Sequence, residues 1–143
     1  MIQPHFGAPP APMKILAEDL WFPEGPVWMP DGDILLVEIR RGTLTRVTPQ
    51  GRKHIVANLG GGPNGAALGP DGKIYVCNNG GFKWAERDGR HVLAGTPDDY
   101  ETGRIEVVDP HTGRFERLYD RVDGRRLCGP NDLVFDARGG FWF

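Results

Sequence analysis

The 143-residue sequence contains no serine, and this absence removes one large class of hydrolase from consideration. Many ester hydrolases carry a nucleophilic serine in a G-x-S-x-G turn, and here both the motif and the residue are missing. The single glycine-rich run, LGGGPNG (59–65), lacks the lysine and the following helix of a phosphate-binding loop. We therefore expect neither serine-based hydrolysis nor nucleotide phosphate binding.

Cysteine, basic runs and long apolar runs are also scarce. The two cysteines, Cys77 and Cys128, are too few for a disulfide framework, and we interpret them as small buried residues of a reduced, cytoplasmic protein. The net charge is −2, and no stretch approaches the roughly 20 apolar residues that span a bilayer. Residues 1–12 lack the basic start and apolar middle of a secretory signal, which indicates a flexible Pro-rich leader. We expect neither a nucleic-acid nor a membrane partner.

Helical periodicity is absent as well. No window longer than about 10 residues avoids Gly and Pro while keeping a 3.6-residue period. One exception is arguable, because KWAER (83–87) could form a single helical turn. The 21 glycines and 13 prolines fall between short apolar runs, which is typical of many turns between short strands. The sequence therefore predicts an all-β fold.

One sequence frame occurs three times. Each copy opens with Pro and a polar residue, followed by a short apolar strand, a tight turn and a second apolar strand. The copies are PEGPVWMPDGDILLV (23–37), PNGAALGPDGKIYVC (63–77) and PNDLVFDARGGFWF (130–143). The polar position is Glu24 in the first copy, Asn64 in the second and Asn131 in the third. Internal repetition of this kind indicates a repeat architecture.

Two further strands follow each of the first two frames. They are TLTRVT and KHIVA after the first frame, and the two halves of RIEVVDPHTGRFERLY after the second. Four antiparallel strands in roughly 40 to 45 residues are typical of one β-propeller blade. Residues 13–143 would thus hold about two and a half blades, the third cut within its second strand, with 13–20 as the outer strand of a neighbouring blade. Open strand edges then predict self-association.

The repeated polar position predicts a metal site. The first strand of each propeller blade lines the central channel, so the heads of these strands converge at one mouth. Glu24, Asn64 and Asn131 would then form an arc of oxygen donors, which hard cations such as Ca²⁺, Mg²⁺ and Mn²⁺ prefer. Asp132 adds a second oxygen beside Asn131. No His or Cys occupies these positions, so a structural zinc site of the Cys/His type is not expected.

Some of these polar residues have a simpler explanation. Asn and Asp after Pro are common turn formers whose side chains bond the local backbone, and this interpretation stays open for Asn64 above all. Glu is a poor turn former, which favours a ligand role for Glu24. Three further acids belong to turns at the opposite end of the strands and are interpreted as structural: Asp31, Asp71 and Asp136.

The second unit carries an insertion at residues 80–103, after its second strand. Strands alternate in direction, so this insertion returns to the mouth that holds the polar positions. Trp84 and Tyr100 are its candidate substrate-contacting residues, and Phe82 and His91 accompany them. Long loops in compact domains are more often functional than not, so we expect a lid or substrate wall. A plain solvated loop is the alternative.

Together, EGPVW, PNGAALGPDGKIYVCNNGG and GPNDLVFDARGGFWF resemble the senescence-marker-protein/gluconolactonase/luciferin-regenerating-enzyme family of six-bladed propellers. The resemblance covers about residues 13–143. It implies a lactone-hydrolysing enzyme with one divalent cation in the channel, Ca²⁺ being the expected ion and Zn²⁺, Mg²⁺ and Mn²⁺ the alternatives. It also implies that a small sugar-type lactone is the substrate.

The resemblance assigns roles by position. Glu24 matches the family's metal-binding Glu, Asn131 matches a third-blade Asn that contacts metal or substrate, and Asn64 matches a second-blade Asn with a less settled role. Asp132 joins Asn64, Trp84 and Tyr100 as an expected substrate contact. The family's later Asn and its acid/base Asp fall beyond Phe143, so the chain as given would carry an incomplete site.

Two other functions remain open at this point. Related propellers hydrolyse phosphotriesters or arylesters at a similar oxygen-ligand site. A propeller can also be a non-catalytic binding or scaffold module. A binding module has no reason to place Glu and Asn at equivalent strand heads and would favour exposed aromatic residues. A rise in melting temperature with Ca²⁺ would favour the enzyme.

Overall fold

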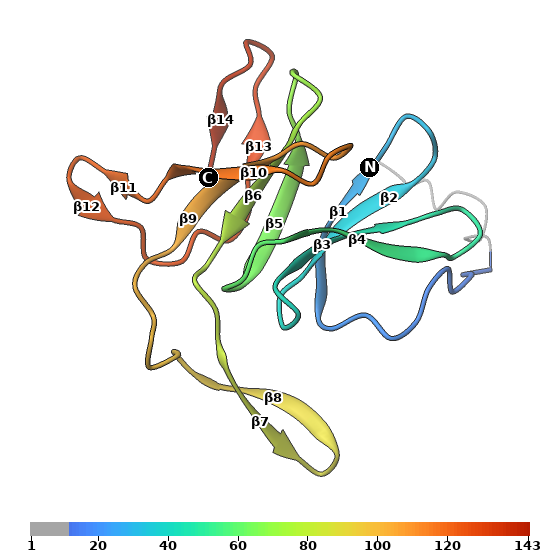
Figure 1. The fold of residues 1–143 in the computed structure, drawn as a ribbon, viewed down its shortest axis with the longest axis horizontal. Coiled ribbons are helices and arrows are strands. Elements are labelled where there is room, and N and C mark those ends of the chain that lie inside the picture. Colours follow the sequence, from blue (N-terminus) through green and yellow to red (C-terminus); the bar gives the residue numbers. More distant parts are fainter. Residues whose placement is uncertain (1–11) are drawn as a thin grey trace, which may run out of the picture.

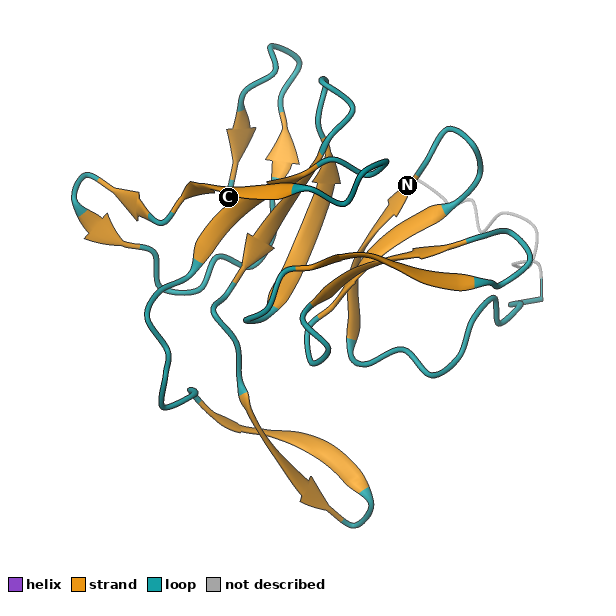
Figure 2. Ribbon diagram, in the orientation of Figure 1, coloured by secondary structure: helices purple, strands orange, loops and turns teal. Residues whose placement is uncertain are grey.

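In the part of the chain that the computed structural model describes, residues 12–143, every regular element is a β-strand (Figure 2). The first sheet runs in the order β1 (Pro23–Trp28), β2 (Ile34–Glu38), β3 (Thr43–Val47) and β4 (Lys53–Asn58). The second contains β5 (Pro63–Leu68), β6 (Ile74–Asn78), β9 (Arg104–Val108) and β10 (Phe115–Tyr119), in the order β10-β9-β6-β5. All neighbouring strands are antiparallel.

Three two-stranded hairpins complete the fold (Figure 1). They are β7 (Lys83–Arg87) with β8 (Arg90–Gly95), β11 (Arg121–Val122) with β12 (Arg125–Arg126), and β13 (Val134–Phe135) with β14 (Phe141–Trp142). The β13–β14 hairpin corresponds to the first two strands of a third blade. The expected all-β fold of two four-stranded blades and part of a third is therefore confirmed.

The repeated turns explain why each frame folds back at the same place. The side chains of Asp31, Asp71 and Asp136 each accept a hydrogen bond from the backbone N–H two residues further on, at 3.0, 3.2 and 2.8 Å respectively. Such a contact closes the turn between the first and second strand of a unit. The structural interpretation of these three acids is confirmed.

The main core lies between the first two blades, where β1 and β5 run side by side (Figure 1). Alternation along each strand sends one set of aliphatic side chains into this layer. The buried members include Val27, Leu35, Val37, Leu44, Ala66, Ile74, Val76 and Val108. Fully burying one such side chain stabilises the fold by about 1.5–3 kcal/mol, so this interface sets the position of β1 relative to β5.

Several expectations fail. KWAER (83–87) forms strand β7 and not a helical turn, because pairing with β8 satisfies its backbone groups. Residues 13–20 form no strand; their backbone carbonyls pack against the first blade, where the Lys53 ammonium donates to the Glu18 carbonyl. Cys128 is exposed and not buried. The predicted leader lies outside the described residues except for Pro12, and the β11–β12 hairpin was not anticipated.

No helix in the range 12–143 is long and apolar enough to cross a membrane.

The buried carboxylate of Glu38 connects the segment just before β1 (residues 21–22, called the lead-in of β1) to the first blade. Glu38 is only 2% exposed, and its oxygens accept hydrogen bonds from Thr45 Oγ1 at 2.6 Å, from the Trp21 backbone N–H at 2.6 Å and from Arg41 Nε at 3.0 Å. Burial alone would raise the pKa of Glu38, but these donors outweigh it and leave the pKa below its ordinary value.

The lowered pKa predicts how stability depends on pH. Glu38 stabilises the fold at pH values above the pKa of an unfolded glutamate, about 4.3, and this stabilisation is lost as the pH falls through the lower folded pKa. Glu38→Gln should therefore lower the free energy of unfolding by about 2 kcal/mol at pH 7. In urea titrations the gap between the two proteins should narrow below pH 4. A gap that is independent of pH would contradict this role.

Candidate functional site

The three polar positions lie at one end of the blades. Strands β1, β5 and β13 run in the same direction, so their first residues share the end from which the β7–β8 hairpin projects (Figure 1). In the first two blades the ladder is interrupted just after the strand begins, between Glu24 and Val27 and between Pro63 and Gly65. Bulges of this kind re-aim a side chain, and here they affect Glu24 and Asn64.

These residues meet around one small cavity. A space of about 70 Å³ is lined by Glu24, Asn64, Asn131 and Asp132, together with two glycines. The Asn64 amide donates a hydrogen bond to Asn131 Oδ1, which joins the second blade directly to the third. The structure thus brings together all four polar residues that the sequence predicted for the mouth. Their roles in binding a metal or a substrate stay predictions.

Two glycines make this convergence possible, and sequence reasoning missed them. Gly25 and Gly65 follow the polar position in the first and second frames. A Cβ on Gly25 would lie 2.6 Å from the Ala66 backbone nitrogen, and a Cβ on Gly65 would lie 2.5 Å from the Asn131 carbonyl oxygen. Real Cβ atoms do not approach so closely, so the first two inner strands need glycine here, whereas the third frame has Asp132 at this position. The signal was present in the sequence as the repeated Pro-polar-Gly.

Asp132 serves the local backbone in part. Its Oδ1 accepts a hydrogen bond from the Leu133 N–H at 2.8 Å, as a turn-forming aspartate would. Cys77 of β6 is buried near it, and burial, followed by the negative charge of Asp132, raises the pKa of the Cys77 thiol to about 12. A thiol with so high a pKa is neither a nucleophile nor a metal ligand at neutral pH.

The two cysteines should therefore differ sharply in reactivity. With an excess of a thiol reagent such as 5,5′-dithiobis(2-nitrobenzoate) at pH 7.5, the folded protein is expected to release one equivalent of chromophore from this pair, from exposed Cys128. Cys77 should react only after denaturation, and a Cys128→Ala variant should show almost no fast phase. Fast modification of Cys77 in the folded protein would contradict its buried, protonated state.

The donor set at the mouth fits a hard cation. The four polar side chains offer only oxygen atoms as ligands, two of them carboxylates and two amides. One water occupies about 30 Å³ of liquid, so a 70 Å³ space suits a single cation with a bound water. Among residues 12–143 no cluster contains three or more His, Cys, Asp or Glu. A cation here would therefore rely on the amide oxygens and on ligands outside these four residues.

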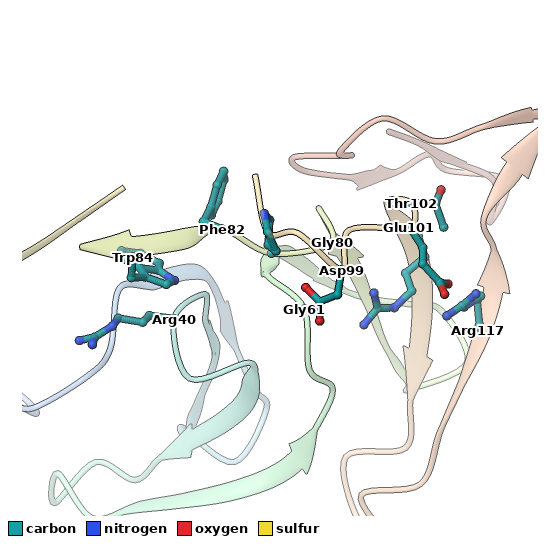
Figure 3. A pocket seen from close by; sticks show the side chains of 12 residues that line it. Arg40, Gly61, Gly80, Phe82, Trp84, Asp99, Glu101, Thr102 and Arg117 are labelled. Carbon is teal, nitrogen blue, oxygen red and sulfur yellow. The ribbon is translucent and has the colours of Figure 1, made fainter. Parts of the chain in front are cut away.

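The insertion at 80–103 forms a wall around a second, larger cavity (Figure 3). This space of about 420 Å³ lies at the same end of the blades and is bordered by Trp84 and Phe82 of the insertion. Trp84 packs on Phe22, with 5.3 Å between ring centroids, which fixes the hairpin to the lead-in of β1. Part of the insertion is therefore a hairpin that borders this cavity, and its role as a lid or substrate wall stays a prediction.

The structure separates the two residues predicted for this wall. Trp84 borders the cavity, whereas Tyr100 packs against the backbone of Gly80 and does not line it. His91 is exposed on β8. Sequence reasoning missed Arg40, Asp99 and Glu101, which do line the cavity. No pattern marks Arg40, because only tertiary packing brings the end of β2 beside the insertion, and nothing distinguishes Asp99 and Glu101 from the other charged residues of the insertion.

Three comparisons with known proteins place the chain among its relatives. Residues 22–143 match the model of the SMP-30/Gluconolactonase/LRE-like region. A gluconolactonase of Zymomonas mobilis subsp. mobilis (strain ATCC 31821 / ZM4 / CP4) is 30% identical over 146 residues, which cover 92% of this chain and 35% of that protein. The chain thus spans about a third of the length of this curated relative.

Solved structures agree in fold. A gluconolactonase of Xanthomonas campestris superposes with a TM-score of 0.67 at 20% sequence identity, over 90% of this chain and 36% of the other. A structural-genomics target classed with the gluconolactonases gives a TM-score of 0.66 at 22% identity, over 91% and 38% of the two chains. At these identities the likeness shows the propeller-type fold.

Proposed function

The chain belongs to the SMP-30/gluconolactonase/LRE-like family, and on that premise we propose that the whole protein hydrolyses a small sugar-type lactone with the help of one divalent cation. The observation that carries this proposal is the meeting of Glu24, Asn64 and Asn131 at one mouth, each supplied by a different repeat of the same frame. The gluconolactonase of Zymomonas mobilis, 30% identical, supports the substrate class.

Glu24 supplies the charge of the site. Its carboxylate and the amide oxygens of Asn64 and Asn131 would hold the cation, Ca²⁺ being the expected ion and Zn²⁺, Mg²⁺ and Mn²⁺ the alternatives. A divalent cation bound there supplies Lewis acidity toward a lactone carbonyl and acidifies water. Because Asn64 and Asn131 are neutral, Glu24 would be the only charged one of these three ligands and would not by itself cancel the charge of a divalent cation, which would favour a carbonyl oxygen.

The remaining residues position and enclose the substrate. Asp132 accepts a hydrogen bond from a substrate hydroxyl through Oδ2, because Oδ1 already accepts one from the Leu133 N–H. Trp84 and the hairpin that carries it stand beside the mouth and exclude water from one side of the bound lactone. Ring opening adds one water across the ester bond and releases a hydroxy acid, so each turnover liberates one proton at neutral pH.

Proton release provides the test. The purified protein is stripped of metal with a chelator and incubated with glucono-1,5-lactone in a weakly buffered indicator, with and without each of the four cations. We expect hydrolysis above the spontaneous rate only with a cation, and a higher melting temperature with the same cation. Arylacetates and a phosphotriester are assayed in parallel, and a preference for either would replace the lactonase proposal. If no ester is hydrolysed and no cation raises the melting temperature, the lactonase proposal fails and the alternative of a non-catalytic binding module remains.

A further inference from the structure

The 420 Å³ cavity is several times larger than the space around Glu24, and the two are close neighbours. Gly61 borders the large cavity and Asn64 borders the small one, and only two residues, Gly62 and Pro63, separate them. Their Cα atoms are therefore at most about 11 Å apart. A ligand about 11 Å long that is held at the mouth would therefore reach the border of the larger cavity.

One end of the large cavity is aromatic. Phe82 and Trp84 are half-buried and lie edge to face, with ring centroids 6.3 Å apart. Arg40 lies with its guanidinium carbon 4.8 Å from the ring centroid of Trp21 and 5.6 Å from that of Trp84, so its charge is engaged by the two indoles (Figure 3). Aromatic faces carry negative charge density, which suits the electropositive C–H face of a sugar ring.

The other part of the cavity offers free acceptors. Asp99 and Glu101 are exposed, and neither carboxylate takes part in an ion pair within residues 12–143. Figure 3 shows Asp99 between the aromatic end and the end that holds Glu101 and Arg117. Ionised carboxylates only accept hydrogen bonds. The cavity is therefore built for a ligand that donates several of them.

The cations of the cavity are already engaged by the protein. Arg104 donates from Nε to Glu106 at 2.6 Å, and Arg117 donates to Asp120 at 3.3 Å. The charge of each arginine is thus already balanced by a carboxylate, and an anionic ligand would in addition face Asp99 and Glu101, which have no ion-pair partner among the described residues. The hydroxyl groups of a neutral ligand are not repelled by these carboxylates and can donate hydrogen bonds to them. The two carboxylates without an ion-pair partner thus favour a polyol over a phosphate or a carboxylate.

From these observations we infer that the cavity is a second sugar subsite, and that the preferred substrate is a lactone that carries a further glycosyl residue, an aldobionolactone. The lactone ring lies at the mouth beside Glu24, the second ring packs on Phe82 and Trp84, and its hydroxyls donate to Asp99 and Glu101. This inference rests on the proposed lactonase function for its reaction, but the sugar-binding surface itself does not depend on it.

Kinetics provide the first test. The wild-type protein is assayed with glucono-1,5-lactone and with cellobiono-1,5-lactone, which differs by one glucosyl unit. We expect kcat/KM to be about tenfold higher for the larger lactone. The double variant Asp99→Asn/Glu101→Gln should bring the two values close together while changing the smaller lactone less than twofold. Trp84→Ala should lower kcat/KM for both lactones, and for the larger one by clearly more. Equal values in the wild type, or equal losses for both lactones, would overturn the subsite.

Neighbouring Asp98 supplies a matched control. It is 91% exposed at its side chain, pairs with Lys83 and does not border the cavity. Asp98→Asn removes the same charge one residue away and should leave the ratio of the two kcat/KM values unchanged. The double variant keeps the shape of both side chains, so it tests the hydrogen bonds even where Trp84→Ala loosens the hairpin.

Binding without chemistry separates this inference from the proposed function. Methyl β-cellobioside contains no lactone, and its association is measured by calorimetry on the same four proteins. If no lactone is hydrolysed at all, the function proposal fails, and the glycoside then decides the subsite. Millimolar binding that the Trp84 and double variants lose would support it, whereas no binding, or binding that the variants retain, would overturn it.

Discussion

Replacing Glu24 with glutamine is expected to lower kcat/KM for glucono-1,5-lactone by about 10³-fold. Glu24 is the one carboxylate at the three repeated strand heads, and the amides of Asn64 and Asn131 cannot replace its charge. Glutamine keeps the size of the side chain and one oxygen, so the strand should fold as before. The loss would therefore report the weaker hold on the cation and not a change of architecture.

Two measurements separate binding from folding in this variant. The rise in melting temperature with Ca²⁺ should disappear in Glu24→Gln, while the melting temperature without cation should change by less than 2 °C, because Glu24 is exposed. Glu116→Gln, an equally exposed glutamate on β10, provides the charge-matched control and should keep both activity and the cation effect. A Glu24→Gln variant that keeps both would show that the cation is held elsewhere.

Replacing Gly65 with alanine is expected to lower the free energy of unfolding by about 3 kcal/mol and to abolish the cation effect as well. The added Cβ would lie 2.5 Å from the Asn131 carbonyl oxygen and from Asp132 Oδ1, and 2.6 Å from Asp132 Cα. Two of these contacts involve backbone atoms, which cannot rotate away as a flexible side chain can. The segment that carries Asn131 and Asp132 must therefore move away from β5, which separates Asn131 from Asn64.

The control for this variant is Gly89→Ala in the turn between β7 and β8. A Cβ there would meet nothing within 4 Å, although its positive φ of 70° carries a cost of about 1 kcal/mol. Chemical unfolding should thus show a small loss for Gly89→Ala and a large one for Gly65→Ala, and calorimetric Ca²⁺ titration should show binding only in the former. Equal losses would mean that the blades tolerate separation at the mouth.

Local sequence signals were sufficient where the chain determines its own turns. Asp31, Asp71 and Asp136 each bond the backbone two residues on, and this contact needs no partner from elsewhere in the chain. The spacing of these turns and the alternating strands between them therefore predicted the two complete blades, the third hairpin and the common end of the three polar positions. The repeats predicted that common end, because equivalent positions in repeated blades occupy equivalent places around the propeller axis.

Tertiary contacts decided the remainder. KWAER pairs with a strand that local preference alone does not specify, and residues 13–20 lie against the first blade without becoming a strand. The sequence alone led to the same prediction for Cys77 and Cys128, that both are buried. Only Cys77 is, because it lies on a strand between two blades.

The sequence by itself determined an all-β chain of repeated blades with an oxygen-donor position at the head of each inner strand, because turn chemistry and alternation act over a few residues. Only the tertiary structure decided how closely those heads approach, which required glycine at Gly25 and Gly65, and which residues face the large cavity. Arg40 and Asp99 come from segments far apart in the chain. They line one cavity because Trp84 of the hairpin packs against Phe22 and Arg40 at the end of the first blade, a tertiary contact that no local pattern encodes.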